Sequence, residues 1–199
     1  MKRILLLAGL LALALPTAAF ASSTIDYSNS GGTLTASTSG LSTTLTLSGS
    51  ALTEIRNFPG GMVTGNLGSV SFTTGALTSG SLDQGGTFAA GGTFTITGNS
   101  GALFTGTFST PLTLTLVTNS DGTHNYILWG SVSGMTGSGL QTVGTTFQLT
   151  VNTGLGFFGG IQTVGSGDTD IVVPEPGSLC LLGTGLIGLA GVVRRKLNA

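Results

Sequence analysis

The sequence predicts an all-β domain, and three observations lead to this fold class. Only 7% of the 199 residues are charged, while Thr, Gly, Ser, Val and Phe are abundant. β-Branched and aromatic side chains suit the pleated surface of a sheet, and Gly supplies turns. Apolar residues alternate with Thr in several short stretches, which is the period of a half-buried strand. We therefore expect one domain of short antiparallel strands, sandwich-like in our first interpretation and barrel-like in the alternative.

Alternation locates the individual strands. Leu alternates with Thr over 44–47 and 112–116, and Phe and Ile alternate with Thr over 93–97. Further strands are predicted near 33–38, 67–74, 87–89, 103–108, 145–151 and 169–173.

The clearest local unit is a predicted β-hairpin that joins Leu112–Thr118 to 124–132. The connecting residues 119–123 are Asn-Ser-Asp-Gly-Thr, which are turn formers. The second strand is apolar on both faces, so we expect it to be central or covered and Trp129 to lie in the core.

Composition limits what the exported part of the chain can bind. Between residues 22 and 173 one basic residue, Arg56, stands against six acidic residues, which gives a formal charge of −5. The acids are Asp26, Glu54, Asp83, Asp121, Asp168 and Asp170. Nucleic-acid binding is disfavoured, because phosphate neutralisation needs clustered Lys and Arg. We place the β-rich domain at 22–165 and a linker at 166–173.

The sequence contains no arrangement typical of an enzyme or of a cofactor site. The chain has one histidine, His124, and one cysteine, Cys180. A Ser–His–acid relay needs a histidine beside a nucleophile, and a zinc cage needs several His or Cys ligands. We interpret His124 as a surface strand residue and expect no catalytic residue, metal or cofactor.

Asp168 and Asp170 form the single close pair of acids in the body. Carboxylates at this spacing contribute to Ca²⁺ sites, which need several oxygen ligands. The interpretation that we favour is a solvated linker before the C-terminal tail.

The N-terminus has the three parts of a secretory signal peptide. Met1-Lys2-Arg3 is basic, residues 4–15 are apolar, and Ala19-Phe20-Ala21 has the small-x-small pattern of a signal-peptidase site. We predict that signal peptidase cleaves after Ala21 and removes residues 1–21.

The C-terminal tail also has three parts. Pro174-Glu175-Pro176 is rigid and extended, because each proline fixes φ and disfavours helix in the residue before it. Residues 177–193 carry no charge and are long enough for a membrane-spanning helix. Arg194, Arg195 and Lys196 follow, and since basic clusters stay cytoplasmic, the body should lie outside the membrane.

Val173-Pro174-Glu175-Pro176, the Gly- and Leu-rich span and the terminal Arg-Arg-Lys resemble the sorting signal of PEP-CTERM proteins. The resemblance covers residues 172–197, and we place the sorting signal itself at 174–197. It implies recognition by exosortase, a membrane-embedded, cysteine-dependent transpeptidase or protease of Gram-negative bacteria. It also implies cutting near Pro-Glu-Pro and delivery to the cell surface or extracellular matrix, while leaving open whether the tail persists as an anchor.

We therefore expect an exported cell-surface or matrix protein with no catalytic activity. Exosortase sorting usually accompanies exopolysaccharide production, so the resemblance implies a place in biofilm surroundings. One alternative is a carbohydrate-binding or adhesive module, for which Tyr27, Tyr126, Trp129 and the Phe residues are candidates to stack on sugars, although we expect most Phe residues in the core. A less favoured alternative is a secreted hydrolase, which would need a buried pair of aspartates in a cleft.

Overall fold

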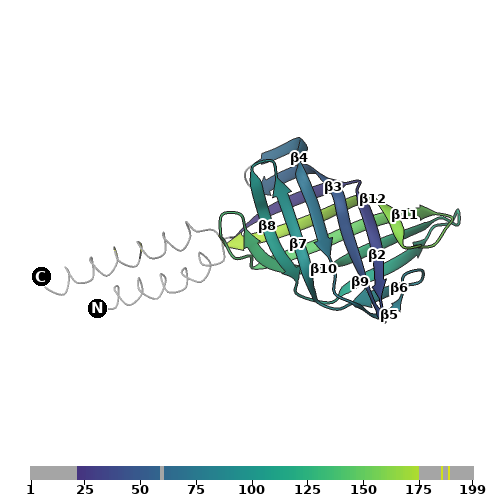
Figure 1. Cartoon of the computed structure of the whole chain (residues 1–199). Helices are drawn as coiled ribbons and strands as arrows, with labels where there is room; N and C mark the ends of the chain where they lie inside the picture. The colour runs from purple at the N-terminus through teal and green to yellow at the C-terminus, as the bar shows by residue number, and fades with distance from the viewer. Residues whose placement is uncertain (1–21, 59–60, 175–184, 186–187, 189–199) are drawn as a thin grey trace, which may run out of the picture. The chain divides into compact units, whose positions relative to one another are not determined.

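The computed structural model describes residues 22–58 and 61–174, with residues 185 and 188, and the two long ranges form an all-β domain (Figure 1). Its strands are β1 (Ser22–Ser30), β2 (Thr33–Ser39), β3 (Ser42–Phe58), β4 (Gly61–Thr73), β5 (Leu77–Ser81), β6 (Gly85–Phe88), β7 (Gly91–Gly98), β8 (Gly101–Phe108), β9 (Leu112–Thr118), β10 (His124–Thr136), β11 (Gly144–Gly154) and β12 (Ile161–Pro174). Every strand pair whose register is defined is antiparallel. The predicted antiparallel all-β class is thus confirmed.

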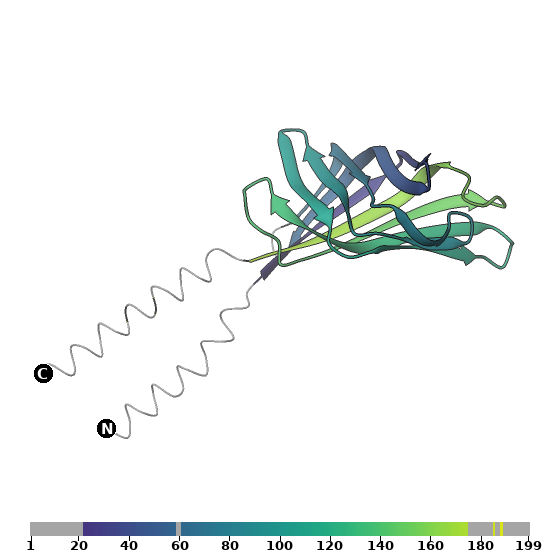
Figure 2. The same cartoon turned by 60° about the horizontal axis from the view of Figure 1, so that its bottom comes forward.

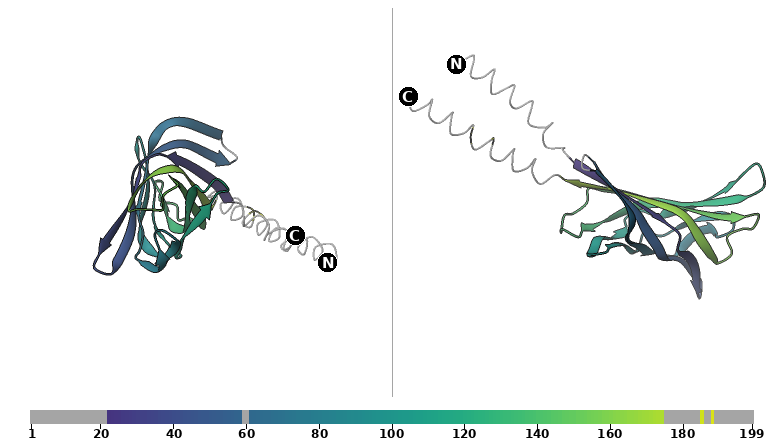
Figure 3. Two further views of the ribbon diagram at one scale, coloured as in Figure 1. Left: turned by 90° about the vertical axis from the view of Figure 1, so that its right-hand side faces the viewer. Right: turned by 90° about the horizontal axis from the view of Figure 1, so that it is seen from above.

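All of these strands belong to one sheet, and eight of them pair in a closed ring. The order around the ring is β2-β3-β4-β7-β8-β10-β11-β12, and it closes because β12 pairs with both β11 and β2. In Figure 1 the strands in front cross those behind at a steep angle, and Figures 2 and 3 show the sheet curving around its interior. Opposite sides of this closed sheet, here called its two walls, face each other as in a sandwich. The walls are joined by continuous strand pairing, as the barrel-like alternative requires.

A cluster of aromatic rings holds the two walls together. Phe147 of β11 packs against Phe72, Phe94 and Phe108 of the opposite wall, with ring centroids 5.1, 5.2 and 5.7 Å away. All four side chains are at most 2% exposed. The rings meet mostly edge to face, the geometry that their quadrupoles favour, so the cluster fixes the spacing of the walls as well as filling the core.

The predicted hairpin is present as β9 and β10. Asn119 N donates to Thr123 O at 2.8 Å, and Gly122 N donates to Asn119 O at 3.0 Å, which closes the turn. His124 pairs with Thr118 as the first rung of the ladder. The other predicted strands coincide with parts of β2, β3, β4, β6, β7, β8, β11 and β12, whereas β1 and β5 were not predicted.

The predicted linker at 166–173 is wrong, because these residues form the second half of β12. They pair with β11 from Ser166 to Val172, and β1 lies on the other side of β12. Thr169 and Ile171 are fully buried and Val173 is 4% exposed. A strand with neighbours on both sides and a buried face is part of the domain, which extends as one compact unit over Thr24–Val173.

The predicted transmembrane segment 177–193 and the signal peptide 1–21 lie outside the described residues, apart from Gly185 and Gly188. Within the part of the chain that the structure describes, no helix has the length and apolar character needed to cross a membrane.

Candidate functional site

A polar groove of about 420 Å³ lies on the outer face of four neighbouring strands, β11, β12, β1 and β3. Side chains alternate between the two faces of a strand, so the buried Thr169 points inward while its neighbours Asp168 and Asp170 point outward. The groove is lined by Asp26, Ser28, Asn29, Ser30, Thr53, Glu54, Arg56, Gln148, Thr150, Ser166, Gly167 and Asp168.

Three carboxyl groups lie close together here, two of them, Asp26 and Asp168, in the lining of the groove and the third, Asp170, beside them. Asp26 comes from β1, and Asp168 and Asp170 come from β12, with one oxygen of each within 4.8 Å of the others. The two β12 acids share a face because they are two residues apart in a strand. Asp26 joins them because β1 is hydrogen-bonded to β12, a pairing between the two ends of the domain.

The crowding of these acids changes their protonation. Burial, a hydrogen bond with Asp168 and repulsion from Asp168 and Asp170 raise the pKa of Asp26 from 3.8 to about 7, against the lowering effect of Arg56. Burial, and then repulsion from Asp168, also raises the pKa of Asp170. Asp26 therefore holds a proton up to near neutral pH. Its Oδ1 is buried without a hydrogen-bond partner among the described residues.

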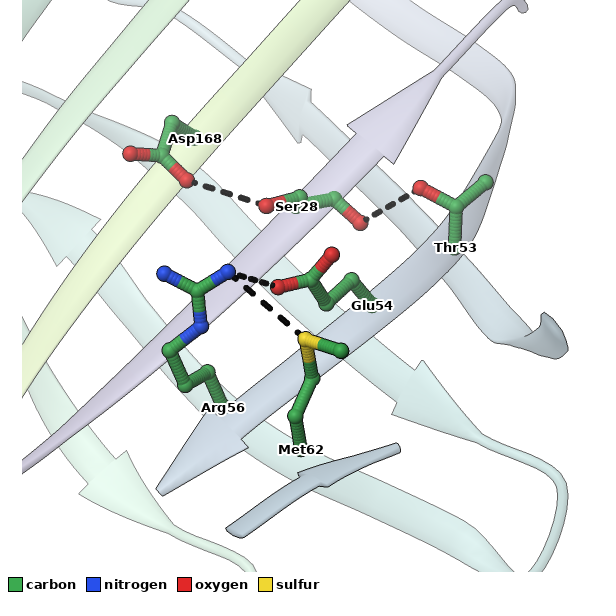
Figure 4. Close-up of polar contacts among 6 residues, drawn as sticks. All are labelled: Ser28, Thr53, Glu54, Arg56, Met62 and Asp168. Atoms are coloured by element: carbon green, nitrogen blue, oxygen red, sulfur yellow. Dashed lines mark hydrogen bonds and ion pairs between the residues drawn. The ribbon is translucent and has the colours of Figure 1, made fainter. Parts of the chain in front are cut away.

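The remaining contacts tie the groove to β1 and β3 (Figure 4). Ser28 donates its hydroxyl to Asp168 Oδ1 at 3.3 Å, and Thr53 donates to the Ser28 carbonyl at 3.2 Å. Arg56 forms an ion pair with Glu54 at 2.6 Å, in which the side chains are 42% and 24% exposed. Arg56 is the one basic residue of the groove lining and stands against three acids, Asp26, Glu54 and Asp168, so the lining keeps an excess of acidic groups.

These groups offer oxygen acceptors to a ligand. Carboxylate and hydroxyl oxygens accept hydrogen bonds from hydroxyl or ammonium groups, and they also ligate hard cations. The sequence-based Ca²⁺ candidates, Asp168 and Asp170, are thus joined by a third acid. Together they offer three carboxylates towards the roughly six to eight oxygens that Ca²⁺ takes, so calcium binding stays a prediction.

Trp129 does not lie in the core, contrary to the prediction. Its side chain is 52% exposed on the outer face of β10, while its neighbour Leu128 is 1% exposed. The prediction failed because it required a cover over both faces of the strand. β10 instead forms part of the domain's outer wall, with β9 and β11 beside it and no described element over the Trp129 ring.

The two tyrosine candidates and His124 are buried. Tyr27 is 4% and Tyr126 0% exposed, so neither presents a ring to a sugar. His124, predicted at the surface, is 8% exposed because the chain after β11 folds over it. Its Nδ1 lies 3.1 Å from Gly156 O, and its ring stacks on Phe157 with centroids 4.4 Å apart.

Most residues of the predicted cleavage and sorting motifs lie outside the residues that the structure describes. Pro174 is the last residue of β12. The signal-peptidase positions Ala19 and Ala21, the motif residues Glu175 and Pro176, Cys180, and the basic residues Arg194, Arg195 and Lys196 lie outside the described residues.

Comparison with known proteins identifies the tail. Residues 172–196 match the family described as the PEP-CTERM protein-sorting motif. No curated protein and no solved structure matches the chain. The motif implies export and exosortase-dependent sorting to the membrane or cell surface in Gram-negative bacteria. This chain therefore carries a PEP-CTERM protein-sorting motif in its C-terminal tail, joined to an antiparallel β domain.

Proposed function

We propose that this chain is a non-enzymatic component of the cell surface or extracellular matrix, associated with exopolysaccharide. The observation that carries the proposal is the sorting motif at 172–196. Signal-peptide cleavage after Ala21, a transient or lasting span at 177–193 and a cytoplasmic basic cluster complete the proposed route.

The junction between domain and motif supports delivery of the folded domain. Val173 is buried in the sheet, Val172 O accepts a hydrogen bond from Val143 N at 2.9 Å, and Pro174 ends β12. The motif thus begins within the last strand, without a spacer. A processing enzyme that acts near Pro-Glu-Pro would release the domain with its final strand intact.

The geometry of the aspartates favours a binding role over hydrolysis. Glycosidases hold two carboxyl groups on opposite sides of the scissile bond, about 5–9.5 Å apart. Here one oxygen each of Asp26, Asp168 and Asp170 lies within 4.8 Å of the others, closer together than the carboxyl groups of a glycosidase.

Localisation of truncated chains tests the sorting proposal. Deletion of 174–199, or of the exosortase of the host, is expected to abolish surface delivery and to leave the domain in the periplasm. Replacement of Glu175 by Ala tests the motif without shortening the chain. Surface delivery in unchanged amounts in all three experiments, the deletion of 174–199, the deletion of the exosortase and Glu175→Ala, would contradict the proposal.

A second candidate function is carbohydrate binding, and the exposure of Trp129 favours it. An exposed indole on a rigid strand offers a flat apolar surface, and the polar groove begins on the adjoining strand with Gln148. A glycan array probed with residues 22–173 tests this function, because the core lies within the compact unit Thr24–Val173. A blank array would count against it.

A further inference from the structure

We propose that the outer face of β10, β11 and β12 binds a polysaccharide segment that carries amino sugars, with Trp129 as the stacking platform and Asp168 as the partner of the ammonium group. This inference rests on the carbohydrate-binding candidate and names its site and its ligand class.

Cross-strand register places the key side chains in one line. Trp129 of β10 pairs with Gln148 of β11, and Gln148 pairs with Asp168 of β12. Residues opposite each other in an antiparallel ladder share a face, and all three are exposed. Since neighbouring strands lie about 4.8 Å apart, the indole and the carboxylate are about 10 Å apart, a span suited to an oligosaccharide lying across the strands.

The apolar end of this line is built for stacking. Trp129 is flanked on its own face by the half-buried Ile127 and by Thr113, its partner on β9. Val117, at 36% exposure, extends the apolar strip. The C–H face of a sugar ring is apolar and slightly positive, so it packs favourably on the electron-rich face of an indole.

The other end of the line is built for polar recognition. Gln148 offers both a donor and an acceptor, and Ser166 and Asp168 continue the groove. Asp26 and Asp170 lie beside Asp168, so the end of the groove is acidic. The domain as a whole carries one basic and six acidic residues between positions 22 and 173.

Charge complementarity selects the ligand class. An acidic groove repels uronic acids, sulfated sugars and phosphate-bearing polymers, whereas it attracts protonated amines. A cationic amine beside Asp168 also reduces the repulsion between the neighbouring carboxylates of Asp168 and Asp170.

Trp129 reports on its own site, because it is the one tryptophan in the chain. The full chain in a non-ionic detergent is titrated with three tetramers of the same linkage: glucosamine, N-acetylglucosamine and glucose. Indole fluorescence, its quenching by acrylamide and calorimetry are recorded at low and high salt. We expect the glucosamine tetramer to change the emission and protect the indole, with binding that weakens as salt rises.

Variants locate the site. Trp129→Ala is expected to weaken calorimetric binding of the glucosamine tetramer about tenfold, and Trp129→Phe less, because a ring remains. Asp168→Asn is expected to weaken it about three- to fivefold. The matched controls are Leu41→Ala, another exposed apolar residue, and Asp83→Asn, which removes the same charge elsewhere; both should bind as the parent does.

The outcomes separate the inference from the function on which it rests. Equal binding of all three tetramers at Trp129, unaffected by Asp168→Asn, would overturn the amino-sugar assignment and leave carbohydrate binding standing. No binding of any tetramer would overturn both. Binding of Ca²⁺ alone at the aspartates, with no effect of any tetramer on the indole, would also overturn the inference.

Discussion

The raised pKa of Asp26 predicts that the domain loses stability as pH rises towards 7. The native state holds the Asp26 proton more tightly than the unfolded chain, in which the pKa returns to 3.8. The folded state is therefore favoured most below about pH 4, and this contribution is lost as pH rises through about 7. Asp26→Asn keeps the shape of the protonated acid and removes the titration, so it should flatten this slope.

The difference between the pKa of Asp26 in the folded and unfolded states gives the size of the effect. A change from 3.8 to about 7 corresponds to a ceiling of about 4 kcal/mol, at about 1.4 kcal/mol for each pH unit. Asp26 is only half-buried in an open groove, so solvent screening reduces this to about 1–2 kcal/mol. We expect Asp26→Asn to match the parent at pH 4 and to exceed its stability by about 1–2 kcal/mol at pH 8. A smaller slope of the same sign should remain, because the pKa of Asp170 is also raised.

Urea denaturation of residues 22–173, followed by circular dichroism between pH 4 and 8, measures this difference. Asp121→Asn is the control of opposite sign, since hydrogen bonds from Thr123 hold the pKa of Asp121 below its usual value. That variant should be less stable than the parent throughout pH 4–8, because the lowered pKa keeps Asp121 ionised over this range, and it should keep the parent's slope. If Asp26→Asn were less stable than the parent at pH 8, or kept the full slope, the assignment of the proton to Asp26 would be refuted.

Two further predictions concern the core and the turns. Phe147→Ala should lower the free energy of unfolding by about 3–5 kcal/mol in urea denaturation, because it removes the ring that packs against Phe72, Phe94 and Phe108 across the interior. The control Leu41→Ala should change it by less than about 0.5 kcal/mol, since Leu41 is exposed. Similar losses for both variants would contradict the role of the aromatic cluster. Gly92→Ala should cost about 3 kcal/mol or more, because φ is +78° and the new Cβ would collide with Thr73 O. Gly31→Ala, with φ at +66° and open space around the new Cβ, should cost about 1–2 kcal/mol. Equal melting temperatures for the two glycine variants would show that the backbone contact at Gly92 is unimportant.

Local patterns in the sequence were enough to predict the class of fold and most strands. The alternation of Leu with Thr in β9, and the Asn-Ser-Asp-Gly-Thr turn after it, act between residues close in the chain, so the hairpin was predictable. The strand pairing of β1 was not, because Ser22–Ser30 is mainly polar and its partners are β3 and β12. Asp168 and Asp170 are two residues apart, a spacing that is common in solvated segments. In a strand the same spacing puts both side chains on one face, so it could have predicted that the two carboxylates of β12 lie together.

The sequence by itself determined the sorting tail and the all-β character, because both depend on contiguous residues: a proline-bounded tripeptide, an uncharged span, a basic cluster and a period of two. The tertiary structure alone decided that β12 closes the ring, that Trp129 faces outward and His124 inward, and that Asp26 meets Asp168 and Asp170. Each of these depends on which distant strands pair and which side of the sheet is covered. That choice is made by burial of the whole core, and the spacing of residues along the chain does not reveal it.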